Sequence, residues 1–178
     1  MDFLVLINKD NKVKDDVKSF DIIKTSCSTY NKEEILVNKV IEDDLINMFN
    51  AAKSKGLNLY VSSGYRSIEE QTEIYDNGKN PLAAIPGCSE HQVGLAIDII
   101  HSEISKDDLE KNPYIFEDTK EFEWLIKNCY KYGFILRYPK GKENKTLIPY
   151  EPWHYRYVGI NNAIKIQKSK KVLEEYVN

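Results

Sequence analysis

Residues 88–100, Cys-Ser-Glu-His-Gln-Val-Gly-Leu-Ala-Ile-Asp-Ile-Ile, connect one histidine to one aspartate through an almost entirely apolar run. Such a run predicts a strand in the middle of a sheet over 93–100. His91 must precede the strand, because an odd separation within one strand would place its side chain and that of Asp98 on opposite faces. A carboxylate is costly to bury alone, so we expect Asp98 to contact a metal ion or an arginine, or to face solvent at the strand end.

A second stretch, residues 151–157 (Glu-Pro-Trp-His-Tyr-Arg-Tyr), surrounds one histidine with aromatic residues. Considered alone, His154 is more simply a histidine packed among aromatic rings. Pro152 interrupts any regular spacing, and a bend there could turn Glu151 and His154 into one cavity. Together the two stretches supply two imidazoles, one carboxylate for a metal and one spare carboxylate. That set is typical of a catalytic zinc site, where three protein ligands leave a position for water and a nearby carboxylate acts as general base.

Other polar residues give weaker signals. Arg66 follows a Ser-Gly-Tyr turn at the end of a predicted strand. Its guanidinium could hold a substrate carboxylate or an oxyanion, but a surface salt bridge is the simpler explanation. Cys88 and His91 have Cys-x-x-His spacing without a second pair, which is weak evidence for a structural zinc site, and a cysteine nucleophile at Cys88 lacks a supporting pattern. His101 lies on the far face of the predicted strand and is left out of the site.

The rest of the chain intersperses short strands and helices without a regular βαβ rhythm, which predicts an α+β fold. The length of 178 residues fits one domain over residues 1–178. Helices are expected from Asn31 to Gly56, from Ser67 to about Tyr75, from Ser105 onward, over 118–132 and over 163–176. Further strands are expected over 3–7, 57–61 and 134–138, and a loop over 12–30.

Charge and composition argue against several classes of protein. The net charge of −3 disfavours a protein built to neutralise nucleic-acid phosphates. No apolar run approaches the roughly 20 residues of a membrane span. Residues 1–8 lack the basic segment and cleavage site of a signal peptide, which predicts a cytoplasmic protein, or a cell-envelope protein whose leader has been removed. The three cysteines are widely spaced and odd in number, which predicts free thiols.

Three motifs resemble those of the zinc D-alanyl-D-alanine carboxypeptidases and dipeptidases, which are vancomycin-resistance enzymes of the VanY, VanX and VanXY type. They also resemble the related L,D-carboxypeptidases of bacterial peptidoglycan. The motifs are Ser63-Gly64-Tyr65-Arg66-Ser67 with Gln71, Ser89-x-His91-x-x-Gly94-x-Ala96-x-Asp98, and Glu151-x-Trp153-His154-Tyr155-Arg156-Tyr157. Residues 4–12, 86–87 and 132–139 also resemble the sequences of this family, so the likeness extends from the first predicted strand to about Gly159. The two metal motifs together are highly specific, and the Ser-Gly-Tyr-Arg motif alone is moderately so.

The resemblance implies a zinc D,D-peptidase (hedgehog-like) fold, in which helices flank a small central antiparallel sheet. One zinc ion would be bound by three residues: His91, Asp98 and His154. Glu151 would be the catalytic base, and Arg66 would bind substrate and stabilise the tetrahedral intermediate. Gln71 and Ser89 would help to hold the carboxylate of the C-terminal D-residue. The implied reaction is attack of zinc-bound water on the last peptide bond of a peptidoglycan precursor stem, which releases D-alanine.

Two departures from the family pattern concern specificity. The pure dipeptidases carry an acidic residue just before the Gly/Ala-Tyr-Arg step, where it can meet the free amine of a dipeptide. Ser63 occupies that position here, which favours a carboxypeptidase acting on a longer stem. The link between Gln71 and Pro86 also looks shorter than in VanXY-like members, which predicts a more open cleft.

Other features leave alternatives open. Cys88 beside Ser89, and the start without a leader, resemble the bifunctional VanXY-like members, so additional dipeptidase activity remains an expectation. An L,D-carboxypeptidase acting on tetrapeptide stems is a second candidate. A non-catalytic peptidoglycan-binding module is a third, but the presence of Glu151 and Arg66 disfavours it.

Overall fold

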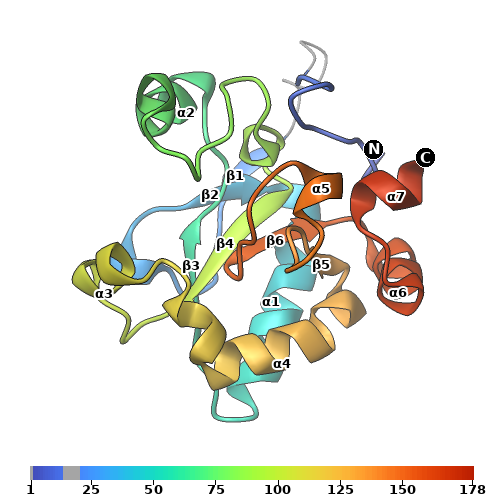
Figure 1. Ribbon diagram of the computed structural model, residues 1–178. Coiled ribbons are helices and arrows are strands. Elements are labelled where there is room, and N and C mark those ends of the chain that lie inside the picture. Colours follow the sequence, from blue (N-terminus) through green and yellow to red (C-terminus); the bar gives the residue numbers. More distant parts are fainter. Residues whose placement is uncertain (1, 14–20) are drawn as a thin grey trace.

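The protein is built around two antiparallel sheets (Figure 1). The computed structural model describes residues 2–13 and 21–178. The larger sheet has the order β3-β4-β6-β5, and β1 pairs separately with β2. The strands are β1 (Ile22–Lys24), β2 (Leu36–Asn38), β3 (Leu59–Ser63), β4 (Ala96–His101), β5 (Phe134–Leu136) and β6 (His154–Tyr157). The helices are α1 (Lys39–Lys53), α2 (Ile68–Tyr75), α3 (Lys106–Lys111), α4 (Lys120–Asn128), α5 (Glu143–Thr146), α6 (Ile160–Ser169) and α7 (Leu173–Val177). The α+β class and the small antiparallel sheet are therefore confirmed.

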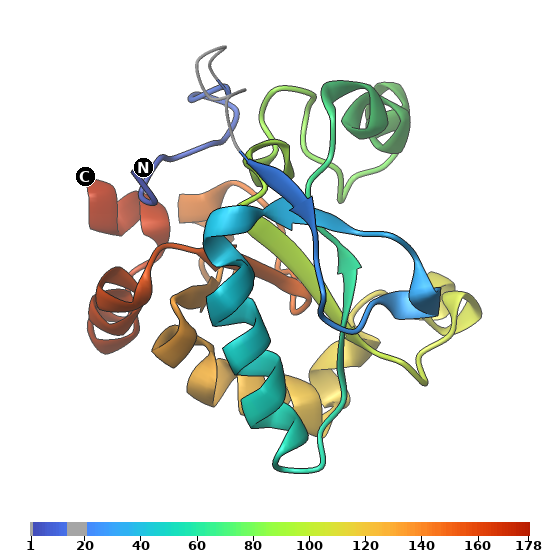
Figure 2. The same cartoon turned by 180° about the vertical axis from the view of Figure 1, so that it is seen from behind.

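The central strand β4 separates the core from the face that carries the polar residues. Ile97 and Ile99 are fully buried in the main core, whereas Asp98 and Ile100 line cavities on the opposite face. Figure 2 shows α1 running along the back of the sheet, where it covers the apolar face. The alternation within β4 thus leaves the front of the sheet available for a site.

Helix α1 supplies much of this core through apolar residues at helical spacing. Its buried side chains include Ile41, Leu45, Met48 and Ala52, each 0% exposed. The helix begins later than expected, because the side chain of Asn38 accepts a hydrogen bond from Val40 N and caps the first turn. The predicted start at Asn31 is wrong, since residues 36–38 are drawn into the pairing of β2 with β1.

The N-terminal expectations need two corrections. The strand expected over 3–7 is absent from the described residues, and the carbonyls of Phe3 and Val5 instead accept hydrogen bonds from the Arg156 guanidinium, at 3.1 and 2.9 Å. The loop expected over 12–30 contains β1 at Ile22–Lys24, while residues 14–20 of that loop lie outside the described residues.

Local capping signals predicted other elements correctly. Ser67 and Ser105 each form a capping box, at the start of α2 and of α3. The helical segment over 118–132 consists of α4 followed by a short 3₁₀ helix and ends at Gly133, as expected. The single helix expected over 163–176 is wrong, because Lys170 adopts a left-handed conformation (φ 55°) and divides the segment into α6 and α7.

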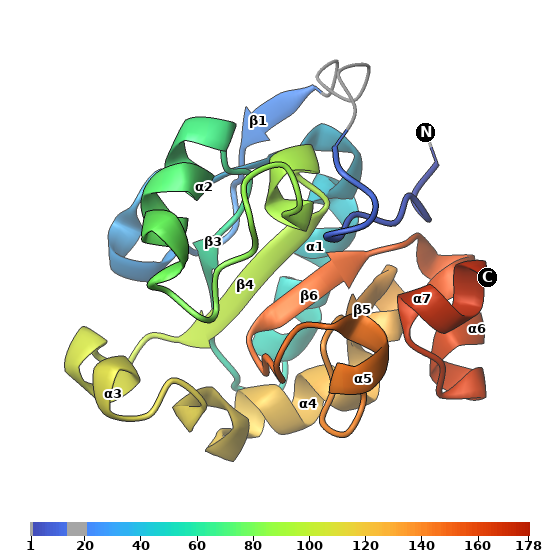
Figure 3. The ribbon, with the colours of Figure 1, turned by 45° about the horizontal axis from the view of Figure 1, so that its top comes forward.

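The front of the sheet is framed from two sides. Seen from above in Figure 3, α2 and the loop that follows it lie over one side of β4, and α5 lies beyond β6 on the other. Among the described residues, no helix combines the length and apolar character needed to cross a membrane.

Candidate metal centre

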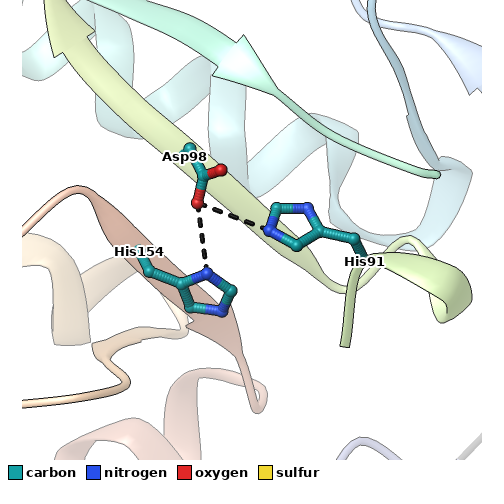
Figure 4. Close-up of side chains that lie close together, drawn as sticks. All are labelled: His91, Asp98 and His154. Carbon is teal, nitrogen blue, oxygen red and sulfur yellow. Dashed lines mark ion pairs between the residues drawn. The ribbon is translucent and has the colours of Figure 1, made fainter. Parts of the chain in front are cut away.

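Three side chains from two neighbouring strands and a short helix meet at the front of the sheet (Figure 4). Asp98 on β4 and His154 on β6 are cross-strand partners, and His91 comes from the 3₁₀ helix Glu90–Val93 just before β4. Asp98 Oδ1 lies 3.4 Å from His91 Nε2 and 3.1 Å from His154 Nδ1. One donor atom from each of the three residues lies within 4.8 Å of the others.

The turn between His91 and β4 depends on Gly94. This residue has φ +65°, and a Cβ atom there would lie 2.8 Å from the backbone nitrogen of Asn38. Asn38 N in turn donates a hydrogen bond to the Gly94 carbonyl. Glycine therefore permits both the left-handed turn and the close approach of the next layer of the fold, and so places His91 before β4 as the sequence predicted.

The donor atoms fit a metal ion better than they fit one another. The ring of His91 donates from Nδ1 to the Gly64 carbonyl at 2.6 Å, which leaves the lone pair of Nε2 facing Asp98. His91 Nε2 and Asp98 Oδ1 are buried and have no hydrogen-bond partner within the described parts of the chain. Buried polar atoms without partners are costly, and two imidazoles with one carboxylate are ligands that zinc accepts.

Glu151 completes the carboxylates of the site. It is 5% exposed, and its Oε2 atom lies 3.5 Å from His154 Nδ1. Both side chains line the same cavity, as expected from a bend at Pro152. Burial raises the pKa of Glu151 to about 7, against the partly opposing effect of His154. A carboxylate with such a pKa can accept and return a proton near neutral pH.

Arg66 lies against Asp98 and His91 of the candidate metal centre, so the simple surface salt bridge considered for it is wrong. Its side chain is 17% exposed, its Nη2 atom lies 3.8 Å from Asp98 Oδ2, and its backbone nitrogen donates to the His91 carbonyl. Burial lowers the pKa of Arg66, although Asp98 and Glu151 oppose that effect. Within the described chain, Arg66 is therefore the one arginine or lysine that lines the cavity with these carboxylates.

Gln71 and Ser89 both line the cavity, in different ways. Gln71 accepts a hydrogen bond from Arg66 Nη1 at 3.0 Å and donates to the Ala84 carbonyl at 2.7 Å. It thus ties Arg66 to the loop after α2. Ser89 accepts a hydrogen bond from His91 N and caps the 3₁₀ helix, so its hydroxyl hydrogen is available to donate.

The cavity and an adjoining groove define the space for a ligand. The cavity has a volume of about 130 Å³, and residues 80–84 of the loop after α2 form one wall. A second, mainly apolar groove of about 280 Å³ shares Leu82, Asp98 and Trp153 with it. Ser62 and Ser63 border this groove, whose apolar walls include Tyr30, Ile100, Leu109, Pro113 and Phe116.

Glu90 was missed by the sequence reasoning. Its side chain is fully buried, and Oε1 accepts a hydrogen bond from Arg137 Nε at 2.8 Å and lies 2.8 Å from Arg156 Nη1. Burial alone would raise the pKa of Glu90, but the two arginines more than offset it and hold that pKa below its usual range. Arg137, inside the strand predicted over 134–138, was the available signal, because a buried arginine requires an acidic partner.

The remaining candidates stay outside the site. His101 Nε2 lies 3.7 Å from Glu121 Oε1, and His101 is not part of the cluster of His91, Asp98 and His154. The three cysteines are free, and burial raises the pKa of the Cys88 thiol, which disfavours a thiolate nucleophile there.

Comparison with known proteins gives consistent matches. The family model described as VanY, D-alanyl-D-alanine carboxypeptidase, matches residues 34–160. The D-alanyl-D-alanine carboxypeptidase of Enterococcus faecalis is 34% identical over 196 residues, covering 98% of this chain. The chain spans less than two thirds of the length of the curated relatives it matches, between 57% and 66% in four cases.

Two solved structures are similar throughout. The LdcB LD-carboxypeptidase superposes with a TM-score of 0.86 at 38% identity, covering 98% of this chain and 85% of that one. A variant of the vancomycin-resistance D,D-pentapeptidase VanY, solved in complex with Zn(II), superposes with a TM-score of 0.83 at 33% identity over the full length of both chains.

Proposed function

This chain belongs to the VanY D-alanyl-D-alanine carboxypeptidase family, and we propose that it is a zinc-dependent D,D-carboxypeptidase. Its substrate is the stem peptide of peptidoglycan or of a peptidoglycan precursor, from which it removes the C-terminal D-alanine. One observation carries the proposal: the buried cluster of His91, Asp98 and His154 lies beside Glu151, in a chain similar over its full length to a VanY structure containing Zn(II). We further propose that residues 1–178 form one peptidase domain.

His91, Asp98 and His154 are the zinc ligands. A zinc ion held there supplies a Lewis acid for the scissile carbonyl and lowers the pKa of a water molecule to about 7. His91 presents Nε2, because its Nδ1 atom is occupied by the Gly64 carbonyl, and His154 presents Nδ1, the ring atom nearer to Asp98.

Glu151 is the general base. Its carboxylate lies 3.5 Å from a ligand nitrogen, close enough to take a proton from the attacking water and pass it to the leaving amine of D-alanine. A non-catalytic binding module would not need this buried carboxylate, whose burial is costly.

Arg66 stabilises the negative oxygen that develops on the scissile carbonyl, because its guanidinium already lies beside Asp98. Gln71 orients Arg66 through the 3.0 Å hydrogen bond. The Ser89 hydroxyl, at the cavity wall, helps to hold the carboxylate of the terminal D-residue.

The apolar groove accommodates the part of the stem that precedes the scissile bond. It joins the cavity at Asp98 and Trp153, and Ser63 on its border offers no charge to a free amine. A longer peptide therefore fits this surface better than a dipeptide does, which supports carboxypeptidase over dipeptidase activity.

A second candidate function is L,D-carboxypeptidase activity on tetrapeptide stems. The similarity to the LdcB LD-carboxypeptidase, with a TM-score of 0.86, is what favours it. The expected cytoplasmic location stays a prediction, which cell fractionation would test.

The test is amino-acid release by the purified, zinc-loaded protein from three peptides in parallel. They are a pentapeptide stem ending in D-Ala-D-Ala, the D-Ala-D-Ala dipeptide, and a tetrapeptide stem ending in an L-D bond. We expect D-alanine from the pentapeptide and little from the dipeptide. Comparable release from the dipeptide would overturn the argument from Ser63, and release from the tetrapeptide alone would identify an L,D-carboxypeptidase. If zinc binds and none of the three is cleaved, the enzyme proposal fails.

A further inference from the structure

We infer that Glu90 is a positioning residue for the metal centre, which accepts a hydrogen bond from His154 Nε2 and so directs His154 Nδ1 toward Asp98 and His91. This inference rests on the proposed function, because it assumes that the three residues bind zinc. Glu90 is a buried carboxylate beside the cluster that the proposed reaction does not use, and the inference assigns it a role.

The two ring nitrogens of His154 have different surroundings. Nδ1 faces the cluster, at 3.1 Å from Asp98 Oδ1. Nε2 faces away from it, at 3.6 Å from Glu90 Oε2. Neither Nε2 nor Glu90 Oε2 has a hydrogen-bond partner within residues 2–13 and 21–178, and both are buried. Two unsatisfied atoms of complementary type thus lie opposite each other, and a shift of about half an ångström would bring them within hydrogen-bond distance.

The hydrogen bond of His91, the other histidine of the cluster, supports this role for Glu90. A histidine that binds a metal almost always donates its other ring N–H to a carboxylate or a backbone carbonyl. His91 already does so through the Gly64 carbonyl. For His154 the acceptor within reach of Nε2 is Glu90 Oε2. Each imidazole then has its own hydrogen-bond acceptor, and His91 would bind zinc through Nε2 whereas His154 would bind it through Nδ1.

The remaining contacts of Glu90 explain why it stays in place. Arg137 and Arg156 hold its other oxygen, Oε1, at 2.8 Å each. Arg156 also donates to backbone carbonyls of Phe3, Val5 and Tyr157, and Arg137 donates twice to Glu174 on α7. The carboxylate is therefore anchored through one oxygen, while the other remains free for His154. Tyr138 packs on the same imidazole, with ring centroids 4.9 Å apart, and limits its rotation.

The first experiment measures zinc affinity by competition with a chromogenic chelator, without any peptide substrate. The proteins are the wild type, E90Q and the matched control E174Q. E90Q should bind zinc about 10- to 100-fold more weakly, as is typical when the partner of a ligating histidine is replaced. E174Q removes the negative charge of the other carboxylate that pairs with Arg137, but Glu174 does not face His154. E174Q should therefore bind zinc like the wild type. An E90Q protein that is folded and binds zinc like the wild type would overturn the inference, as would equal losses in the two variants.

The second experiment needs no variant, in case E90Q does not fold. Nitrogen NMR of the zinc-loaded wild type with labelled histidine should show His154 protonated at Nε2 and His91 protonated at Nδ1. Zinc bound to His154 through Nε2 would overturn the inference and leave the proposed activity standing. A wild-type protein that binds no zinc would instead overturn the proposed function, and this inference with it.

Discussion

The two sides of the His154 ring lie in contrasting electrostatic surroundings. On the Nδ1 side, Asp98 and Glu151 are two carboxylates bordered by one arginine, Arg66, at 3.8 Å from Asp98. On the Nε2 side is a buried charge network, which we define as Glu90, Glu174, Arg137 and Arg156. In this network two carboxylates face two arginines at 2.6 to 2.8 Å.

The metal centre needs an external cation to balance its charges, whereas the network does not. The network balances its own charges, and such an arrangement can be buried because each ion has a partner. With its imidazoles neutral, as metal ligands must be, the metal centre has two carboxylates against one arginine. Two of its atoms, His91 Nε2 and Asp98 Oδ1, have no hydrogen-bond partner among the described residues. A bound divalent cation would correct both, so charge balance at the metal centre should depend on the metal and charge balance in the network should not.

The largest effect should follow from removing a ligand. H91A should lose zinc and lower D-alanine release by roughly 10⁴-fold or more, because the metal contributes several kcal/mol to transition-state stabilisation. Zinc should raise the free energy of unfolding of the wild type, by about 2.7 kcal/mol at 100 times the Kd, but not that of the variant. Metal analysis and urea unfolding check both statements. H101A is the matched control, and the expectation fails if H91A retains zinc or if H101A loses it.

Removing the proposed base should separate chemistry from metal binding. E151Q should keep zinc and lower kcat by about 10²- to 10⁴-fold, the usual contribution of a general base. Steady-state kinetics and metal analysis provide the measurement, with E123Q on the exposed face of α4 as the control. Activity within a few-fold of the wild type would show that Glu151 does not transfer the proton.

Breaking the network should cost stability whether or not zinc is present. R156M leaves Glu90 with one arginine fewer and frees the Phe3 and Val5 carbonyls, so unfolding should become easier by about 3–5 kcal/mol. Urea unfolding of the zinc-free proteins should show this loss, because the network loses a partner whether or not the metal is bound. K24M, which breaks the exposed ion pair of Lys24 with Glu34, should change stability by less than about 1 kcal/mol. A zinc-free R156M protein as stable as the zinc-free wild type would contradict this prediction.

The smallest effect concerns an ion pair at the surface. Lys140, and then Tyr150, lower the pKa of Glu117 below its ordinary value of 4.5. The ionised Glu117 side chain therefore contributes to the free energy of unfolding above pH 4.5. This contribution is lost as the pH falls through the lowered pKa of Glu117 in the folded protein. E117Q should lower stability at neutral pH by about 0.5 kcal/mol. The difference from the wild type should shrink between about pH 5 and pH 2, as measured by urea unfolding. A constant difference over that range would show that the charge of Glu117 is not its cause.

Local signals in the sequence predicted the parts of the fold that depend on neighbouring residues. Ser67 and Ser105 cap their helices as expected, because a capping box involves only residues three positions apart. The apolar run before His101 became the central strand β4. By contrast, residues 3–7 have the composition of a strand, but they pair with no strand in the described structure. Arg156 of β6 donates hydrogen bonds to the carbonyls of Phe3 and Val5 instead.

For the candidate metal centre, residue chemistry and order were enough to propose His91, Asp98, His154 and Glu151, since few residue types bind zinc or transfer protons and the chain has only three histidines. Family resemblance then suggested their roles. The contacts among these residues could not be predicted, because they depend on the register between β4 and β6, which pairs Asp98 with His154.

The sequence by itself determined which side chains could do the chemistry and that an apolar strand follows His91. Only the tertiary structure revealed that Glu90 stands behind His154, and that Arg137, 47 residues further along the chain, holds it there. The physical reason is that propensity and capping act over a few residues, whereas the partner of a buried charge is chosen when distant segments pack and exclude water.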